Sequence, residues 1–175
     1  MLFEQSQLLL NKALAAATHA NVNVNIAVCD AGGNLCAFQR MDRSPLGSVD
    51  IAQKKARSAV LFSAPTEALG QLVREQQLDS FEQTNGGLIL FAGGEPVFFK
   101  GQLIGGVGIS GGSAAEDKMI ALAAINQAGL DSAGATDEAS AWGDRPVSGA
   151  RQSVSEPWTA LFNPAGTAVR RTGLP

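Results

Sequence analysis

The chain has 175 residues, of which 45% are hydrophobic and 17% are charged, a composition typical of one compact domain with a substantial core. Its formal net charge of −3 argues against a broad nucleic-acid surface, because phosphate binding needs concentrated positive charge. No apolar stretch is long enough to span a bilayer and the first residues lack a basic secretory start, so we expect a cytoplasmic protein without a membrane partner. The two cysteines, Cys29 and Cys36, are expected to be reduced thiols, and no cluster of Cys and His predicts a metal site.

Hydrophobic periodicity divides the first 129 residues into helices and strands. Apolar residues recur every three to four positions in some segments and alternate with polar residues in others. Gly32-Gly33 supplies the positive φ values of a tight turn, and Ser113 with Glu116 has the capping-box pattern of a helix start. The predicted helices cover residues 4–20, 49–62, 66–77 and 114–128, and the predicted strands cover residues 22–28, 35–41, 87–91, 95–100 and 103–110.

This order of elements predicts an α+β domain. Consecutive strands with short connections pair antiparallel, so we expect a sheet of about five antiparallel strands covered by helices over residues 1–129. Residues 130–175 are rich in Asp, Ser, Gly, Ala and Pro, with isolated large apolar residues such as Trp142 and Trp158. We expect an extended C-terminal arm rather than a second domain, packed along its own subunit or a neighbour, because exposed tryptophans are costly.

Several short motifs follow one another along residues 5–129. They are the turn Asp30–Leu35, Arg40-Met41-Asp42, Ile51-Ala52 with Lys55-Ala56, Phe62 with Pro65-Thr66, Asn85-Gly86-Gly87, and Ile104 through Ser113 with Asp117. With these motifs the chain resembles the GlcG/HbpS-like family of haem-degrading or haem-binding domains. The resemblance implies a fold similar to profilin and PAS domains, a symmetric homo-oligomer, and haem or another small molecule as ligand. The chain departs from the family pattern at Asn34, where many members carry His.

Few side chains in this sequence are able to ligate haem iron. The iron is usually held by His, Cys, Met or Tyr, and the chain has one histidine, His19, and no tyrosine. His19 lies near the end of the first predicted helix, where an imidazole also interacts favourably with the helix dipole. Two interpretations therefore stand: His19 is a haem ligand or general base, or it is a helix-end surface residue.

Two basic residues are candidates for holding a carboxylate. Arg40 ends a predicted strand and can make a bidentate contact, although a surface ion pair would explain it equally. Lys55 lies on a predicted helix and matches a lysine of the family pattern. Its ammonium could reach the same concavity or act as a desolvated amine, and the alternative is a solvated helix surface.

Two glycine-rich turns are candidates for ligand contact. Ser110-Gly111-Gly112-Ser113 presents N–H groups ahead of a helix start, where anions bind, and Asn85-Gly86-Gly87 permits close approach of a ligand. Each is also explained as a turn without a ligand. Glu116 and Asp117 are candidates for an acid/base pair beside the first turn, and helix capping explains both without catalysis.

Two functional hypotheses follow. In the first, the protein is an oligomeric haem- or small-ligand-binding protein in which Arg40 and Lys55 hold carboxylates. In the second, it is a cofactor-free lyase or isomerase acting on a small carboxylate, with Arg40 as anchor and Lys55, Glu116 or Asp117 transferring protons. A structural or regulatory partner protein without chemistry is a third option. The candidate residues are predicted to line one concave site: Arg40, Lys55, Asn85, residues 110–113 and Asp117.

Overall fold

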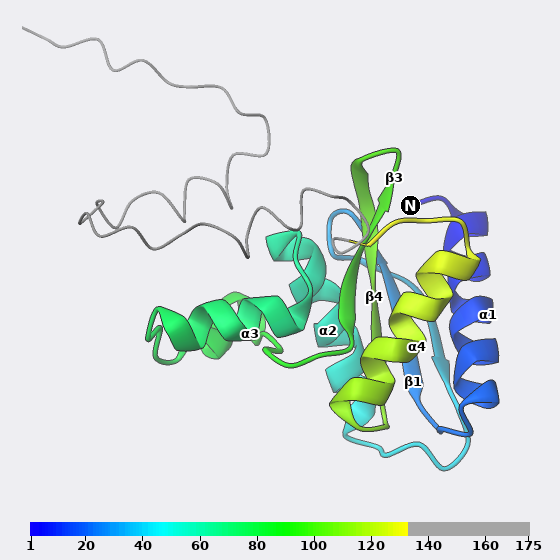
Figure 1. Cartoon of the computed structure of the whole chain (residues 1–175), viewed down its shortest axis with the longest axis horizontal. Coiled ribbons are helices and arrows are strands. Elements are labelled where there is room, and N and C mark those ends of the chain that lie inside the picture. Colours follow the sequence, from blue (N-terminus) through cyan, green and yellow to red (C-terminus); the bar gives the residue numbers. More distant parts are fainter. Residues whose placement is uncertain (133–175) are drawn as a thin grey trace, which may run out of the picture. The chain divides into compact units, whose positions relative to one another are not determined.

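Residues 1–132 are described by a computed structural model, in which most elements follow the predicted order (Figure 1). The helices are α1 (Phe3–His19), α2 (Ser48–Phe62), α3 (Thr66–Glu75), the short 3₁₀ helix η1 (Phe81–Gly86) and α4 (Ala114–Gln127). The strands are β1 (Asn25–Asp30), β2 (Leu35–Arg40), β3 (Gly94–Phe99) and β4 (Gln102–Ser110). One antiparallel sheet lies between helices, which confirms the predicted α+β class.

The strands are ordered β2-β1-β4-β3, and every neighbouring pair is antiparallel. Asn25 at the start of β1 lies between Arg40 of β2 and Ser110 of β4. At the other end of β1, Asp30 lies opposite Gly105 of β4. We refer to these two ends as the Ser110 end and the Asp30 end of the sheet, and the candidate residues divide between them.

The sheet formed by the described residues has four strands rather than the predicted five, because residues 87–91 do not form a strand. Their backbone groups bond to helical side chains instead. The Ile89 N–H donates to Ser58 Oγ at 3.0 Å, and Thr66 Oγ1 donates to the Phe91 carbonyl at 2.6 Å. Backbone groups satisfied in this way do not form a ladder with a neighbouring strand. The strand predicted at 87–91 was therefore wrong.

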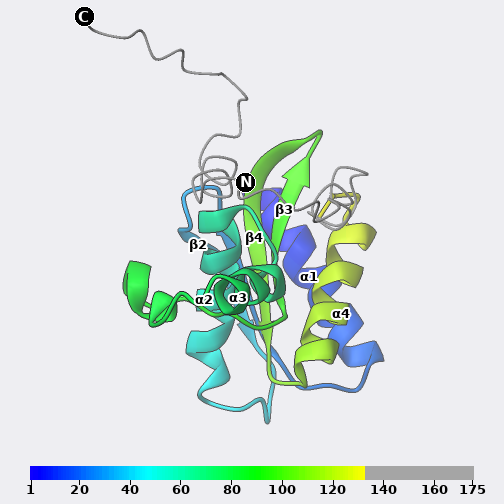
Figure 2. The same ribbon diagram turned by 60° about the vertical axis from the view of Figure 1, so that its left-hand side comes forward.

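Different helices cover the two faces of the sheet. α1 and α4 pack side by side on one face, while α2 covers the other with α3 beyond it (Figure 2). Successive side chains of β1 point to opposite faces of the sheet, so this one strand contributes to the core on each face. Ile26 and Val28 belong to the core under α1 and α4, whereas Ala27 and Cys29 belong to the core under α2.

α2 lies unusually close to β4, since two glycines of that strand face it. A Cβ on Gly108 would lie 2.0 Å from the Ala52 carbonyl oxygen, and one on Gly106 would lie 2.7 Å from that of Ala56. Only glycine at these positions allows the helix backbone to approach so closely. The approach also brings Lys55, on the same helix, against the sheet.

The described part of the chain ends just after α4. Leu130 is buried in the core, and Asp131 exchanges two backbone hydrogen bonds with Phe98 at the end of β3, at 2.8 and 3.0 Å. The arm predicted for residues 130–175, with Trp142 and Trp158, lies outside the described residues from residue 133 onward. Within residues 1–132 no helix has the length and apolar character needed to cross a membrane.

Candidate functional site

Lys55 is fully buried, with a side-chain exposure of 0%. Its Nζ donates hydrogen bonds to Asp117 Oδ2 and to the Ile109 carbonyl oxygen, each at 2.8 Å. The ring of Phe91 lies over the same ammonium, with its centroid 4.8 Å away, a cation–π distance. Of the two interpretations of Lys55, the solvated helix surface is therefore wrong, because the ammonium is enclosed and donates two hydrogen bonds to protein oxygens.

Asp117 is held from two sides in the first turn of α4. Its Oδ2 accepts the Lys55 bond, and its Oδ1 accepts a hydrogen bond from the Gly112 N–H at 3.0 Å. Burial raises the pKa of Asp117 and lowers the pKa of Lys55, while the bond between them opposes both shifts. Within this chain the Gly112 N–H, predicted to receive an external anion, binds the chain's own carboxylate.

Glu116 and Ser113 form the capping box that the sequence predicts. Glu116 Oε2 accepts hydrogen bonds from the Ser113 N–H and Oγ–H, each at 2.8 Å, and Ser113 Oγ accepts one from the Glu116 N–H. The bonds from Ser113 lower the pKa of Glu116. The structure thus gives Glu116 a capping position at the helix start, and the acid/base role remains a prediction.

The remaining candidates lie at different ends of the sheet. Arg40 is exposed at the Ser110 end, two strands away from Ser110. Asn85 is near the Asp30 end, because its carbonyl oxygen accepts a hydrogen bond from Arg57, whose side chain lies against Gly33 of the β1–β2 turn. The structure therefore brings together Lys55, Asp117 and residues 110–113 in one chain, but not Arg40 or the Asn85-Gly86-Gly87 turn.

Asn34 is also at the Asp30 end of the sheet. Asp30 Oδ1 accepts hydrogen bonds from the backbone N–H groups of Gly32 and Asn34, at 2.8 and 2.9 Å, and the Asn34 amide contacts both Asp30 oxygens. These bonds lower the pKa of the Asp30 carboxyl. Asn34 thus stabilises the hairpin turn rather than joining the residues around Asp117.

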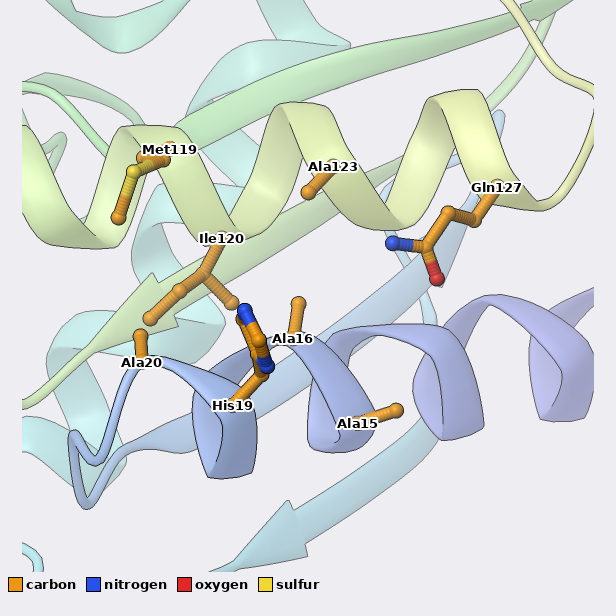
Figure 3. Close-up of a pocket in the computed structure, with 8 residues that line it drawn as sticks. All are labelled: Ala15, Ala16, His19, Ala20, Met119, Ile120, Ala123 and Gln127. Atoms are coloured by element: carbon orange, nitrogen blue, oxygen red, sulfur yellow. The ribbon is translucent and has the colours of Figure 1, made fainter.

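An apolar groove lies between α1 and α4 on the outer surface of the protein. Figure 3 shows the imidazole of His19 extending from α1 toward α4 beside Ile120. The groove has a volume of about 310 Å³. Most of its wall is made of small or unbranched apolar side chains; the lining residues are Ala15, Ala16, His19, Ala20, Met119, Ile120, Ala123 and Gln127.

The alanines of this groove and one buried acid, Glu95, are not among the residues predicted from the sequence. The alanines had a detectable signal, since Ala15 and Ala16 precede His19 by four and three residues and so share a helix face with it. Glu95 of β3 is 1% exposed. It lies two residues from the buried Val97, so the period of two along a strand predicts that both side chains face the same side.

Comparison with known proteins places the chain in a family. Residues 2–126 match the family model described as haem degrading protein HbpS-like. The chain is 36% identical to an uncharacterized 15.0 kDa protein from the dhaT-dhaS intergenic region of Citrobacter freundii, over 64% of this chain and 80% of that protein. A crystal structure of a PduOC:heme complex matches with a TM-score of 0.71 and 33% identity, over 75% of this chain and 96% of that one.

The match to a larger relative is partial. The chain is 36% identical to the corrinoid adenosyltransferase PduO of Citrobacter freundii over 71% of its own length, but it spans only 38% of PduO. The chain is therefore similar to one part of that protein.

Proposed function

The chain belongs to the GlcG/HbpS-like family, and on that basis we propose that it is an oligomeric haem-binding protein in which His19 ligates the iron. The observation that carries this proposal is the position of His19: the only histidine of the chain lies at the apolar groove between α1 and α4. Imidazole is the commonest protein ligand of haem iron among the residues available here. The PduOC:heme complex supports the choice of ligand, since it has the same fold at 33% identity.

The residues of the groove fit a porphyrin. Ala15, Ala16 and Ala123 leave room for a flat ring because their side chains are short, and the exposed Met119 offers apolar contact. The imidazole of His19 is exposed, so an incoming iron can reach it. When bound, haem would supply a redox-active iron, whose potential depends on its axial ligands and surroundings.

Lys12 is placed to bind a haem propionate. It precedes His19 by seven residues on α1, which is close to two helical turns and roughly 10 Å along the same face. Its side chain is half-buried, so the aliphatic part can pack against the ring while the ammonium meets the carboxylate. In this arrangement Lys12, rather than the distant Arg40 or the enclosed Lys55, holds the propionate.

An oligomer would complete the site. The groove is open to the outside and can cover only one face of a porphyrin, and Met119 on its rim is 54% exposed. A second copy packed over the groove would remove the other face of the ring from water. The chain resembles a family of symmetric oligomers, and this resemblance supports an oligomeric site.

The lyase or isomerase alternative is not favoured. It requires Lys55 or Asp117 to exchange protons with a substrate, yet the two bind each other behind the Phe91 ring. Glu116, the third candidate, bonds to Ser113 at the helix start.

The proposal is tested by titrating the purified protein with haemin and following the Soret band, with gel filtration of each mixture. We expect saturable binding at a fixed ratio of haem to protein, and His19→Ala should weaken it at least about tenfold and shift the Soret maximum. Thr18→Ala is the matched control, because Thr18 is adjacent on α1 and does not line the groove. An unchanged spectrum and affinity in His19→Ala would exclude His19 as the ligand.

A second experiment tests the groove without removing the ligand. Ala16→Leu and Ala123→Leu each add bulk to the groove wall, so both should weaken haemin binding. Ala114→Leu is the control, because it adds the same bulk to an exposed position of α4 away from the groove. Equal haemin affinity in all three variants would place the haem elsewhere on the protein.

A further inference from the structure

Glu95 is a buried acid that the proposed haem site does not use. It is the second residue of β3, is 1% exposed, and its Oε1 has no hydrogen-bond partner among residues 1–132. It lies opposite Val107 of β4 and two residues before Val97, and both valines belong to the core under α1 and α4. An unpaired carboxylate in such surroundings is costly, so Glu95 strongly favours either a proton or a cation.

An ion pair between two helices lies near Glu95 at the edge of the sheet: a Cβ on Gly93, two residues before Glu95, would lie 2.7 Å from the Asp117 Cβ, and Asp117 precedes Lys118 on α4. Lys118 of α4 binds Glu67 in the first turn of α3, and both side chains are about half exposed. Lys118 favours the ionised form of Glu95, whereas Glu67 disfavours it. β4 contributes no ionisable residue, and the Lys55 of α2 is already bound to Asp117 of α4.

We propose that Glu95 and Glu67 compete for the Lys118 ammonium, so that one proton on Glu95 decides whether α4 is tied to α3 or to β3. With Glu95 uncharged, Lys118 remains on Glu67, which is the arrangement in the structure. With Glu95 ionised, Lys118 moves inward, since an uncompensated buried charge costs several kcal/mol while an exposed pair contributes about 1 kcal/mol or less.

The exchange falls near neutral pH. Burial raises the pKa of Glu95 to about 7. Below that pH the carboxyl is neutral and the Lys118–Glu67 pair is retained. Above it the carboxylate takes Lys118 and Glu67 is released to solvent.

Release of Glu67 has a structural consequence one residue away. Thr66 Oγ1 donates to the Phe91 carbonyl oxygen and accepts a hydrogen bond from the Gly94 N–H, at 2.6 and 3.1 Å. Thr66 therefore connects the start of α3 to the segment whose Phe91 ring covers the Lys55 ammonium. We expect protonation of Glu95 to change how well the segment from Phe91 to Gly94 is ordered. The access of solvent to the Lys55 ammonium should change with it.

Nuclear magnetic resonance of the full chain, with ¹³C-labelled glutamate and ¹⁵N-labelled lysine, tests the proposal between about pH 5 and pH 9. In the wild-type protein the Glu95 carboxyl carbon should titrate near neutral pH, and the Lys118 Nζ and the amides of Glu67 and Phe91 should shift with the same midpoint. Glu95→Gln should abolish that shared midpoint. Glu67→Gln, the matched control, should leave Glu95 titrating but remove the response at Phe91.

Two results would overturn the proposal. One is a Glu95 midpoint in the ordinary range of glutamate, near pH 4.3. The other is a Glu95 titration that leaves the Lys118 and Glu67 signals unchanged, which would show that the two carboxylates do not share the ammonium. The wild-type titration decides both outcomes, so the test does not depend on the folding of a variant.

Discussion

Lys55 Nζ on α2 lies 2.8 Å from Asp117 Oδ2 on α4, and this pair joins helices that cover opposite faces of the sheet. The connection passes beside Gly93, the residue just before the edge strand β3. A Cβ on Gly93 would lie 2.7 Å from both Lys55 Nζ and the Asp117 Cβ. The absence of a side chain at Gly93 therefore leaves the space in which the two layers meet.

Breaking this pair from one side should destabilise the protein strongly. Lys55→Met leaves Asp117 buried without its cation, and we expect a loss of about 3–5 kcal/mol in the free energy of unfolding, measured with urea. Lys54→Met is the matched control, because Lys54 is the preceding residue and its pair with Asp50 is on the surface. Lys54→Met should lower the free energy of unfolding by less than about 1 kcal/mol.

A double variant separates charge from packing. Lys55→Met with Asp117→Leu removes both charges and should recover much of the stability lost in Lys55→Met, since buried ion pairs are often replaceable by apolar residues. Equal losses in Lys55→Met and Lys54→Met would contradict the importance assigned to the buried pair.

Gly93→Ala should also be costly, for a steric reason. The new methyl group would overlap the Lys55–Asp117 pair, and Gly93 has a φ of 109°, which side-chain-bearing residues rarely adopt. Gly101 has a positive φ as well, but no heavy atom would lie within 4 Å of a Cβ at this position. Gly101→Ala therefore measures the backbone strain alone, about 1–2 kcal/mol, and Gly93→Ala should cost about 1–3 kcal/mol more. Similar thermal unfolding curves for the two variants would be inconsistent with the crowded site.

The hairpin turn should make stability depend on acid pH. The bonds to Asp30 lower its pKa below the ordinary 3.8, so the folded state holds this carboxylate ionised more readily than the unfolded state. The stabilisation is fully present above the unfolded pKa and is lost as pH falls through the folded one. Urea midpoints of wild type and Asp30→Asn should differ above about pH 5 and converge toward about pH 3. Asp79→Asn, at an exposed carboxylate outside this turn, serves as control, and a constant difference across this range would exclude the Asp30 contribution.

The two thiols should react very differently. Cys36 is exposed, whereas Cys29 is buried and its pKa is raised to about 12, chiefly by that burial. We expect a thiol reagent at neutral pH to modify one thiol rapidly in the folded protein and both in urea. Cys36→Ser should abolish the rapid phase and Cys29→Ala should preserve it. Rapid modification of folded Cys36→Ser would show that β1 opens more readily than its burial indicates.

Local patterns predicted most of the fold, because each depends on residues close together in the chain. The alternation in β1, the Gly32-Gly33 turn and the capping box of Ser113 with Glu116 all involve contacts within a few residues. The strand predicted at 87–91 failed for the complementary reason. Whether its backbone pairs with a strand depends on Ser58 and Thr66, which lie more than twenty residues away in the sequence.

Residue patterns along the chain predict the family, the α+β class and the small set of residues able to ligate, bind or cap. The tertiary structure alone decided which of them meet. Lys55 and Asp117 are 62 residues apart and form one buried pair, whereas Arg40 and Asn85 lie at opposite ends of the sheet. Periodicity shows which face of its own element a residue occupies, but burial and charge depend on what packs against that face.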